Sequence, residues 1–148
     1  MNKVRLLLIT ALALLSFGVS LLAQPPQRSV AQFDVARNIP VLIMSSQRIP
    51  KIAEHIRQAQ ASGQPSILTR VKDKSRINSN RRAACGKFVK PSGQQCDEYP
   101  FASTYEGGAN ASKRAVPAKE QQIQEGIISA FYRKNNIEDG VQFRVRVE

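Results

Sequence analysis

An apolar segment near the start of the chain limits how many residues remain to form a folded domain. Lys3 and Arg5 give the first five residues two positive charges, residues 6–22 are almost wholly apolar, and Ala23 precedes a polar stretch. A basic start, an apolar core and a small residue before a polar turn are typical of a secretory signal peptide. A retained membrane anchor is the alternative, but the apolar run is short for a full span.

The rest of the 148-residue chain has room for one domain. We therefore divide the chain into a signal peptide at 1–23, a polar, Pro-containing tail at 24–38, and a folded domain at 39–148. Removal of the signal would leave an exported protein, extracellular or periplasmic, without stable membrane association.

Positive charge is concentrated in the first half of the expected mature chain. Residues 24–96 contain 13 Lys and Arg against 3 acidic residues, whereas residues 97–148 contain 7 against 8. Lys and Arg neutralise phosphates with release of counterions, so this distribution fits a polyanion such as nucleic acid. The alternative is a basic exported protein held by anionic cell-surface polymers, or kept soluble by its charge.

Two cysteines, Cys85 and Cys96, follow the signal peptide. In an exported chain, an even number of cysteines separated by a short loop predicts a disulfide. Such a bridge would contribute on the order of 2–3 kcal/mol to stability. With His55 as the chain's one histidine, they do not form the ligand set of a zinc finger.

The pattern of apolar residues predicts short strands and helices, and hence an α+β fold. Residues 39–44 and 65–70 have the composition of strands. Apolar positions fall on one face of a helix over 51–61; His55 lies one residue from that face, so we expect it to have a structural role. The remaining expectations are a loop leading into a short helix over 71–82, a turn within 87–95, strands at 101–105 and 112–116, a helix over 120–132 and a strand over 141–147.

Carboxylates gather in the second half of the chain, where eight of the eleven follow residue 96. Carboxylates on the binding face of such a protein would repel a polyanion unless a cation lies between the carboxylates and the phosphates. Carboxylate and amide oxygens hold Mg²⁺ or Mn²⁺, which can bridge protein to phosphate. The clustered residues are Asp97, Glu98, Glu106, Glu120 and Glu125.

The segment at 96–108, CDEYPFASTYEGG, closely resembles the signature of small extracellular bacterial deoxyribonucleases of the NucA/NucB type. That family includes sporulation- and competence-associated DNases and related toxin domains. The resemblance covers residues 39–147. Its flanking matches are Pro50, Ile52, Ala53, His55, Ile56, Ala59, Gly63, Pro65 and Leu68 upstream, and Ala111, Ser112, Val116, Pro117, Glu120, Gln121, Gln124, Asp139 and Gly140 downstream.

The resemblance implies a small single domain with an antiparallel sheet and a ββα-metal core, similar to His-Me finger nucleases. In such a core, two antiparallel strands and a helix hold one metal ion. The implied activity is hydrolysis of DNA phosphodiester bonds without sequence preference, using Mg²⁺ or Mn²⁺. DNA is then the partner, RNA stays open as a second substrate, and we expect a monomer.

By the same match, Asp97 stands where the family carries the residue that activates water. An ionised aspartate can accept that proton. Glu98 and Glu120 complete the acidic residues expected to act in catalysis. The expected metal ligands are Glu120, Gln121, Gln124 and Glu125, with Glu98 as a competitor. Many family members carry Asp-Asn where this chain has Glu120-Gln121, which leaves the choice among these ligands open.

Four basic residues are the candidates for contact with DNA phosphates: Arg81, Arg82, Lys113 and Arg114. Such contacts position the backbone without reading bases. A disulfide between Cys85 and Cys96 would tether the basic segment to the residue before Asp97.

Two other functions remain open. One is a non-catalytic exported protein that binds DNA or the cell envelope on the same fold, although a pure binder would gain affinity by losing its carboxylates. The other is a toxin-like nuclease with a dedicated inhibitor protein.

Overall fold

The computed structural model of the chain describes residues 33–34 and 38–148. The expected signal peptide and most of the expected tail lie outside these residues. Within the tail, Phe33–Asp34 form a short strand, β1, so this part is not wholly irregular. None of the helices in the described ranges is long and apolar enough to cross a membrane.

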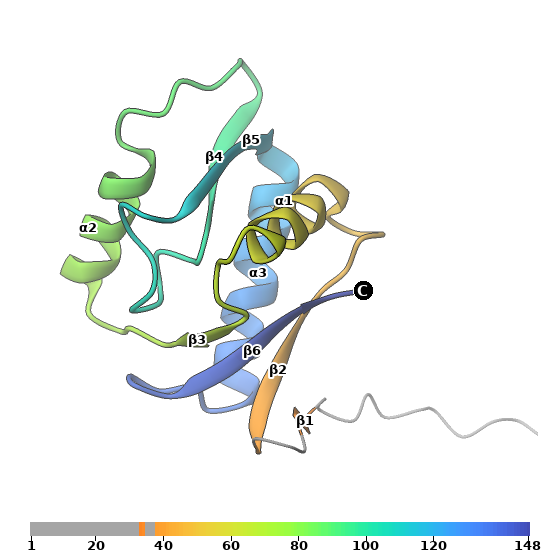
Figure 1. The fold of residues 1–148 in the computed structure, drawn as a ribbon, viewed down its shortest axis with the longest axis vertical. Helices are drawn as coiled ribbons and strands as arrows, with labels where there is room; N and C mark the ends of the chain where they lie inside the picture. Colours follow the sequence, from red (N-terminus) through yellow and green to blue (C-terminus); the bar gives the residue numbers. More distant parts are fainter. Residues whose placement is uncertain (1–32, 35–37) are drawn as a thin grey trace, which may run out of the picture.

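A four-stranded sheet with the order β1-β2-β6-β3 forms one part of the fold. Strand β2 (Ile39–Met44) runs parallel to β6 (Gln142–Val147), and β3 (Ile67–Thr69) runs antiparallel to β6 (Figure 1). The expected α+β class is confirmed. The sheet is mixed, however, and not purely antiparallel, because the strand at the start of the domain and the strand at its end lie side by side in the same direction.

The core lies between this sheet and the two helices packed on it. Helix α1 (Pro50–Ala61) buries its expected apolar face, including Ile52 and Ile56, and contacts β6. Strand β6 alternates as its sequence predicts, with Phe143 and Val145 buried. Each such side chain contributes about 1.5–3 kcal/mol by leaving water. Helix α1 and helix α3 (Ala118–Lys134) also contact the second, smaller sheet, so the same core supports both sheets.

That smaller sheet is an antiparallel pair of β4 (Gln94–Tyr99) and β5 (Ser112–Pro117). Helix α3 (Ala118–Lys134) begins at the residue after β5 and packs against both strands. Two antiparallel strands followed directly by a helix are compatible with the expected ββα-metal core. This unit carries most of the acidic residues considered above.

The expected strand at 101–105 is wrong, since the strand of this region is β4, which ends at Tyr99. In the segment that follows, Thr104 donates from its backbone N–H and its hydroxyl to the Phe101 carbonyl, which closes a turn. The next corner requires glycine, because a Cβ on Gly107 would lie 2.3 Å from the Phe101 oxygen. The Glu106 carboxylate accepts from the Thr69 amide, so it holds this loop against β3.

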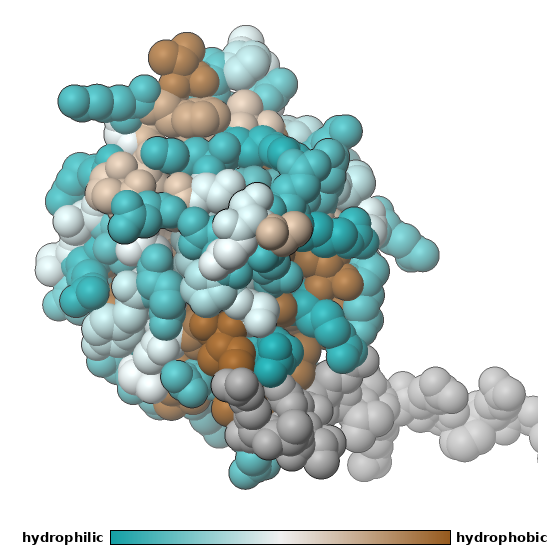
Figure 2. All heavy atoms as spheres, in the orientation of Figure 1, coloured by the Kyte–Doolittle hydropathy of each residue, from teal (hydrophilic) through white to brown (hydrophobic). Residues whose placement is uncertain are grey.

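Helix α2 (Lys74–Cys85) is longer than the expected short helix and almost wholly exposed, with Ala84 as its buried residue. It is therefore held by specific contacts and not by an apolar face. Asp73 caps its first turn by accepting from the Arg76 amide, and Asn80 donates to two carbonyls of the 101–105 segment. A disulfide at its last residue ties it to β4. Hydrophilic residues cover most of the face shown in Figure 2.

Candidate active site

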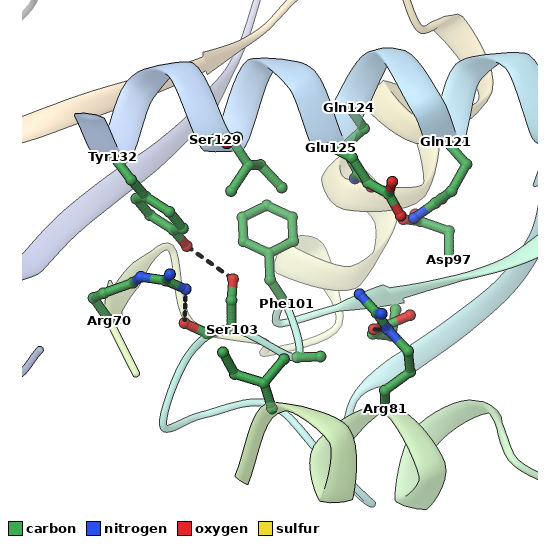
Figure 3. Close-up of a pocket in the computed structure, with 14 residues that line it drawn as sticks. Arg70, Arg81, Asp97, Phe101, Ser103, Gln121, Gln124, Glu125, Ser129 and Tyr132 are labelled. Atoms are coloured by element: carbon green, nitrogen blue, oxygen red, sulfur yellow. Dashed lines mark hydrogen bonds and ion pairs between the residues drawn. The ribbon is translucent and has the colours of Figure 1, made fainter. Parts of the chain in front are cut away.

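A pocket of about 220 Å³ opens between β4, α2 and α3, with the 101–103 segment at its floor. Acidic, basic and amide side chains line it together with a few apolar groups, as Figure 3 shows. The polar residues of its wall are Arg70, Arg81, Asp97, Glu98, Ser103, Gln121, Gln124, Glu125, Ser129 and Tyr132. Six of the residues expected at an active site are thus brought together: Asp97, Glu98, Gln121, Gln124, Glu125 and Arg81.

Strand β4 places Asp97 and Glu98 on opposite faces, because successive side chains of a strand alternate. Asp97 contacts α1 through His55, and Glu98 lies against α2. Both carboxylates nevertheless reach the pocket, and both are buried, with 1% and 7% of their surface exposed. Asp97 therefore connects β4 to α1 on one face of the hairpin, and Glu98 faces α2 on the other.

The contact between Asp97 and α1 is a buried pair with His55. The Asp97 Oδ2 lies 2.7 Å from His55 Nδ1, and the other ring nitrogen, Nε2, lies 3.0 Å from Ser112 Oγ on β5. The sequence suggests no such contact, since His55 precedes Asp97 by 42 residues. These two hydrogen bonds are consistent with the structural role expected for His55.

The environment of Glu98 favours its neutral form. Burial, and then the nearby Asp97 charge, raise the pKa of Glu98 to about 7, although Arg81 opposes the shift. The Arg81 Nε lies 3.9 Å from Glu98 Oε1, which is a weak pair. Cys85 Sγ lies 3.3 Å from the other oxygen, but a disulfide sulfur carries no proton, so this is a packing contact. The pocket thus contains two adjacent carboxylates in different environments.

Two glutamines of α3 face Asp97 across the pocket (Figure 3). Among the described residues, four buried side-chain atoms have no hydrogen-bond partner, and three belong to this group: Asp97 Oδ1, Gln121 Oε1 and Gln124 Nε2. Buried polar atoms are normally paired, so unpaired atoms that converge on one pocket favour a polar ligand there. Glu125, on the same helix, adds a carboxylate. The oxygens of Asp97, Gln121 and Glu125 fit the preference of Mg²⁺ or Mn²⁺ for oxygen ligands, whereas the unpaired Gln124 atom is an amide nitrogen.

Glu120 lies next to Gln121 in sequence but does not line this pocket. Its Oε2 accepts from the backbone N–H groups of Lys51 and Ile52, at 2.9 and 3.1 Å. Lys51 and Ile52 lie in the first turn of α1, where backbone amides have no partners within the helix. The structure thus separates Glu120 from the other three expected ligands.

The four expected phosphate contacts are likewise divided. Arg81 lines the pocket beside Glu98. Arg82 and Lys113 line a second hollow. Arg114 lies 3.6 Å from Glu54 and donates to Gln58, so it faces α1. The fold therefore does not bring all four residues together on one basic surface.

The expected disulfide between Cys85 and Cys96 is present, with 6.0 Å between the two Cα atoms. It joins the end of α2 to the residue before Asp97. Cys85, Cys96 and Glu98 also have the spacing of a metal site. While both sulfurs are bonded to each other, they cannot serve as thiolate ligands.

A family model described as Deoxyribonuclease NucA/NucB matches residues 54–146. The chain belongs to this family. The matched range contains the pocket, both strands of the hairpin and the whole of α3. No curated protein matches the chain. Membership of the NucA/NucB family identifies the chain as a nuclease-type protein, with DNA as the substrate that the family name gives.

The NucA/NucB fold also brings in Arg70, which the sequence analysis does not single out. Its guanidinium lies 4.0 Å from the Tyr132 ring centre and donates to the Ser103 carbonyl at 3.1 Å (Figure 3). Its Nε is the fourth of the unpaired buried atoms. Because Arg70 follows β3 and is more than 25 residues from Asp97, no local pattern indicates that it shares the same pocket.

Proposed function

We propose that this chain is a secreted, divalent-metal-dependent endonuclease that hydrolyses DNA phosphodiester bonds without sequence preference. The observation that carries the proposal is the Asp97 carboxylate. One of its oxygens is held by His55, and the other is unpaired on the wall of a pocket that also contains Arg81 and the α3 glutamines. This is the arrangement expected of a group that takes a proton from water beside a bound phosphate.

In this mechanism, Asp97 accepts the proton of the attacking water through Oδ1. Arg81 and Arg70 pair with the oxygens of the scissile phosphate and of its neighbour, as both guanidinium groups border the pocket. Guanidinium donors recognise phosphate and not base edges, which supports cleavage without sequence preference. Burial and the nearby Asp97 charge raise the pKa of Glu98, so Glu98 holds a proton at higher pH than an exposed glutamate does.

Gln121, Gln124 and Glu125 would hold the divalent ion through their side-chain oxygens, with the Gln124 amide turned to present its oxygen. When bound, the ion would neutralise the charge that develops on the phosphate and lower the pKa of bound water. Glu120 is the fourth ligand expected from the family resemblance, and its amide contacts with α1 make its contribution testable.

Export is supported by the disulfide and by the predicted signal peptide. Disulfides form and persist in oxidising compartments outside the cytoplasm, and the Cys85–Cys96 bridge ties α2, which carries Arg81, to β4. We therefore place the activity in the extracellular space or the periplasm.

The test is a plasmid-nicking assay with the purified chain and its Asp97→Ala variant. We expect conversion of supercoiled to open-circular DNA in Mg²⁺ or Mn²⁺, its loss in EDTA, and its return when metal is restored. Asp97→Ala should reduce the rate by at least about 100-fold, the scale of a lost general base. Glu138→Ala is the matched control, because this exposed carboxylate pairs with Lys72 away from the pocket.

Two outcomes would contradict the proposal. One is nicking by the wild-type protein that continues undiminished in EDTA. The other is an Asp97→Ala variant as active as the Glu138→Ala control. DNA binding without any cleavage would instead favour a non-catalytic exported binder on this fold.

A further inference from the structure

His55 is a buried titratable side chain to which the proposed mechanism gives no function. Only 2% of its surface is exposed, and it lies on the inner face of α1. Both ring nitrogens have a partner, Asp97 on β4 and Ser112 on β5. The ring thus connects the helix to both strands of the hairpin at the position of the proposed base.

The chemistry of the partners decides which way these hydrogen bonds run. An ionised carboxylate can only accept, so Nδ1 of His55 carries the hydrogen and donates to Asp97 Oδ2. In the neutral ring Nε2 is then an acceptor, and the Ser112 hydroxyl donates to it. Ser112 therefore fixes the tautomer that Asp97 requires, as the partners of a histidine generally do.

His55 does not border the pocket itself. Neither ring nitrogen is left to take a proton from water there, since one faces Asp97 and the other faces Ser112. Asp97, in contrast, lines the pocket and has Oδ1 unpaired. An effect of His55 on the reaction must therefore pass through the Asp97 carboxylate.

We propose that His55 is a positioning residue which, with Ser112 behind it, holds one oxygen of Asp97 so that the other faces the reacting water. The inference rests on the proposed role of Asp97 as base. A carboxylate held by a single strand can rotate about its side-chain bonds, and misplacement of a catalytic group by about 1 Å can cost 100-fold in rate. The ring removes that freedom by fastening Oδ2 to α1, which the core fixes in place.

Two variants of similar polarity separate this role from a general structural one. The amide of His55→Asn falls near the position of Nδ1 and can still donate to Asp97. The amide of His55→Gln falls near the position of Nε2 and reaches toward Ser112 instead. We expect His55→Asn to keep kcat within about fivefold of wild type and His55→Gln to lower kcat by about 10–100-fold, the usual range for an orienting partner of this kind. KM for plasmid DNA should change less than about twofold in both, because neither nitrogen contacts the pocket.

Three further variants complete the experiment, each with its melting temperature measured so that rates are compared on folded protein. Ser112→Ala, which leaves the Asp97 contact intact, should lower kcat by about two- to fivefold. Ala61→Ser, an exposed change at the last residue of the same helix, should leave kcat unaltered. In an Asp97→Asn background, His55→Gln should cause no additional loss, because residues that act as a unit are not additive.

The proposal is overturned if His55→Gln is as active as wild type, or if His55→Asn and His55→Gln lose kcat equally while folded. It is also overturned if His55→Gln reduces the residual rate of Asp97→Asn by the same factor as it reduces the wild-type rate. Failure of the proposed function looks different, since Asp97→Asn would then retain full activity whatever stands at position 55.

Discussion

At the scale of the single residue, Glu98 is a buried carboxylate whose surroundings favour its protonated form. Burial and the adjacent Asp97 charge raise its pKa to about 7 from its ordinary value of 4.5. The folded protein therefore binds this proton more tightly than the unfolded chain does. The stabilisation that comes from this bound proton is therefore fully present below about pH 4.5 and is lost as the pH rises through about 7.

Glu98→Gln should remove this dependence, because the amide is neutral at every pH. We expect the variant to be more stable than wild type above pH 7, by on the order of 1–3 kcal/mol, and the difference to shrink toward pH 4.5. Urea denaturation in EDTA at several pH values between 4.5 and 8 measures it, with Glu138→Gln as control, because this exposed carboxylate pairs with Lys72 and does not line the pocket. A difference that is the same at pH 5 and pH 8 would contradict the assignment.

At the scale of the element, α1 begins without a capping side chain of its own. Its N-cap residue, Ile49, offers no acceptor, and its first turn contains no acidic residue. Glu120 supplies one from the first turn of α3, where its carboxylate accepts from the Lys51 and Ile52 amides. Negative charge at a helix N-terminus is favourable, so this contact fastens α1 to α3.

Glu120→Ala should therefore lower the free energy of unfolding by about 1 kcal/mol, the typical loss of a helix cap. Glu120→Gln should lose less, because the amide oxygen can still accept. Denaturant titration measures this effect, and Mn²⁺ titration of the same variants tests the ligand role separately. We expect the Mn²⁺ affinity of Glu120→Gln to stay within about threefold of wild type. A larger loss in that variant would place Glu120 among the ligands.

At the scale of the whole molecule, the chain has a formal net charge of +11, while the pocket contains three carboxylates. Basic residues border this pocket and the second hollow: Arg70 after β3, Arg81 and Arg82 on α2, Lys87 after α2, and Lys113 on β5. Under the proposed function, these residues would neutralise several phosphates of a DNA backbone with release of counterions.

Raising the salt concentration from 50 to 200 mM should then raise KM for plasmid DNA by about 10–100-fold, as expected for a few phosphate contacts. The value of kcat at saturating DNA should change little, because the charges at the pocket act on a phosphate that is already bound. Initial rates over a range of DNA concentrations separate the two constants. A fall in kcat with constant KM would contradict this account of binding.

The sequence by itself determined the local elements and the family. Helix α1 and strand β6 follow from apolar periodicity, because burial of one face is a local property of the residues that form it. The block at 96–108 identifies the NucA/NucB resemblance, which the family match confirms. The disulfide, which is present, was predicted from two cysteines that follow an expected signal peptide. The strand at 101–105 was predicted in error, because its apolar residues pack in a turn whose backbone groups bond to Asn80 and to Arg70.

Only the tertiary structure decided which of these residues meet. His55 on α1 binds Asp97, and Arg70 after β3 lines the same pocket, whereas Glu120, which directly precedes Gln121, turns to α1 instead. The parallel pairing of β2 with β6 likewise joins residues about 100 positions apart. Contacts over such separations are set by how whole elements pack and by the entropy of closing the loops between them, and neither quantity is recorded in the spacing of neighbouring residues.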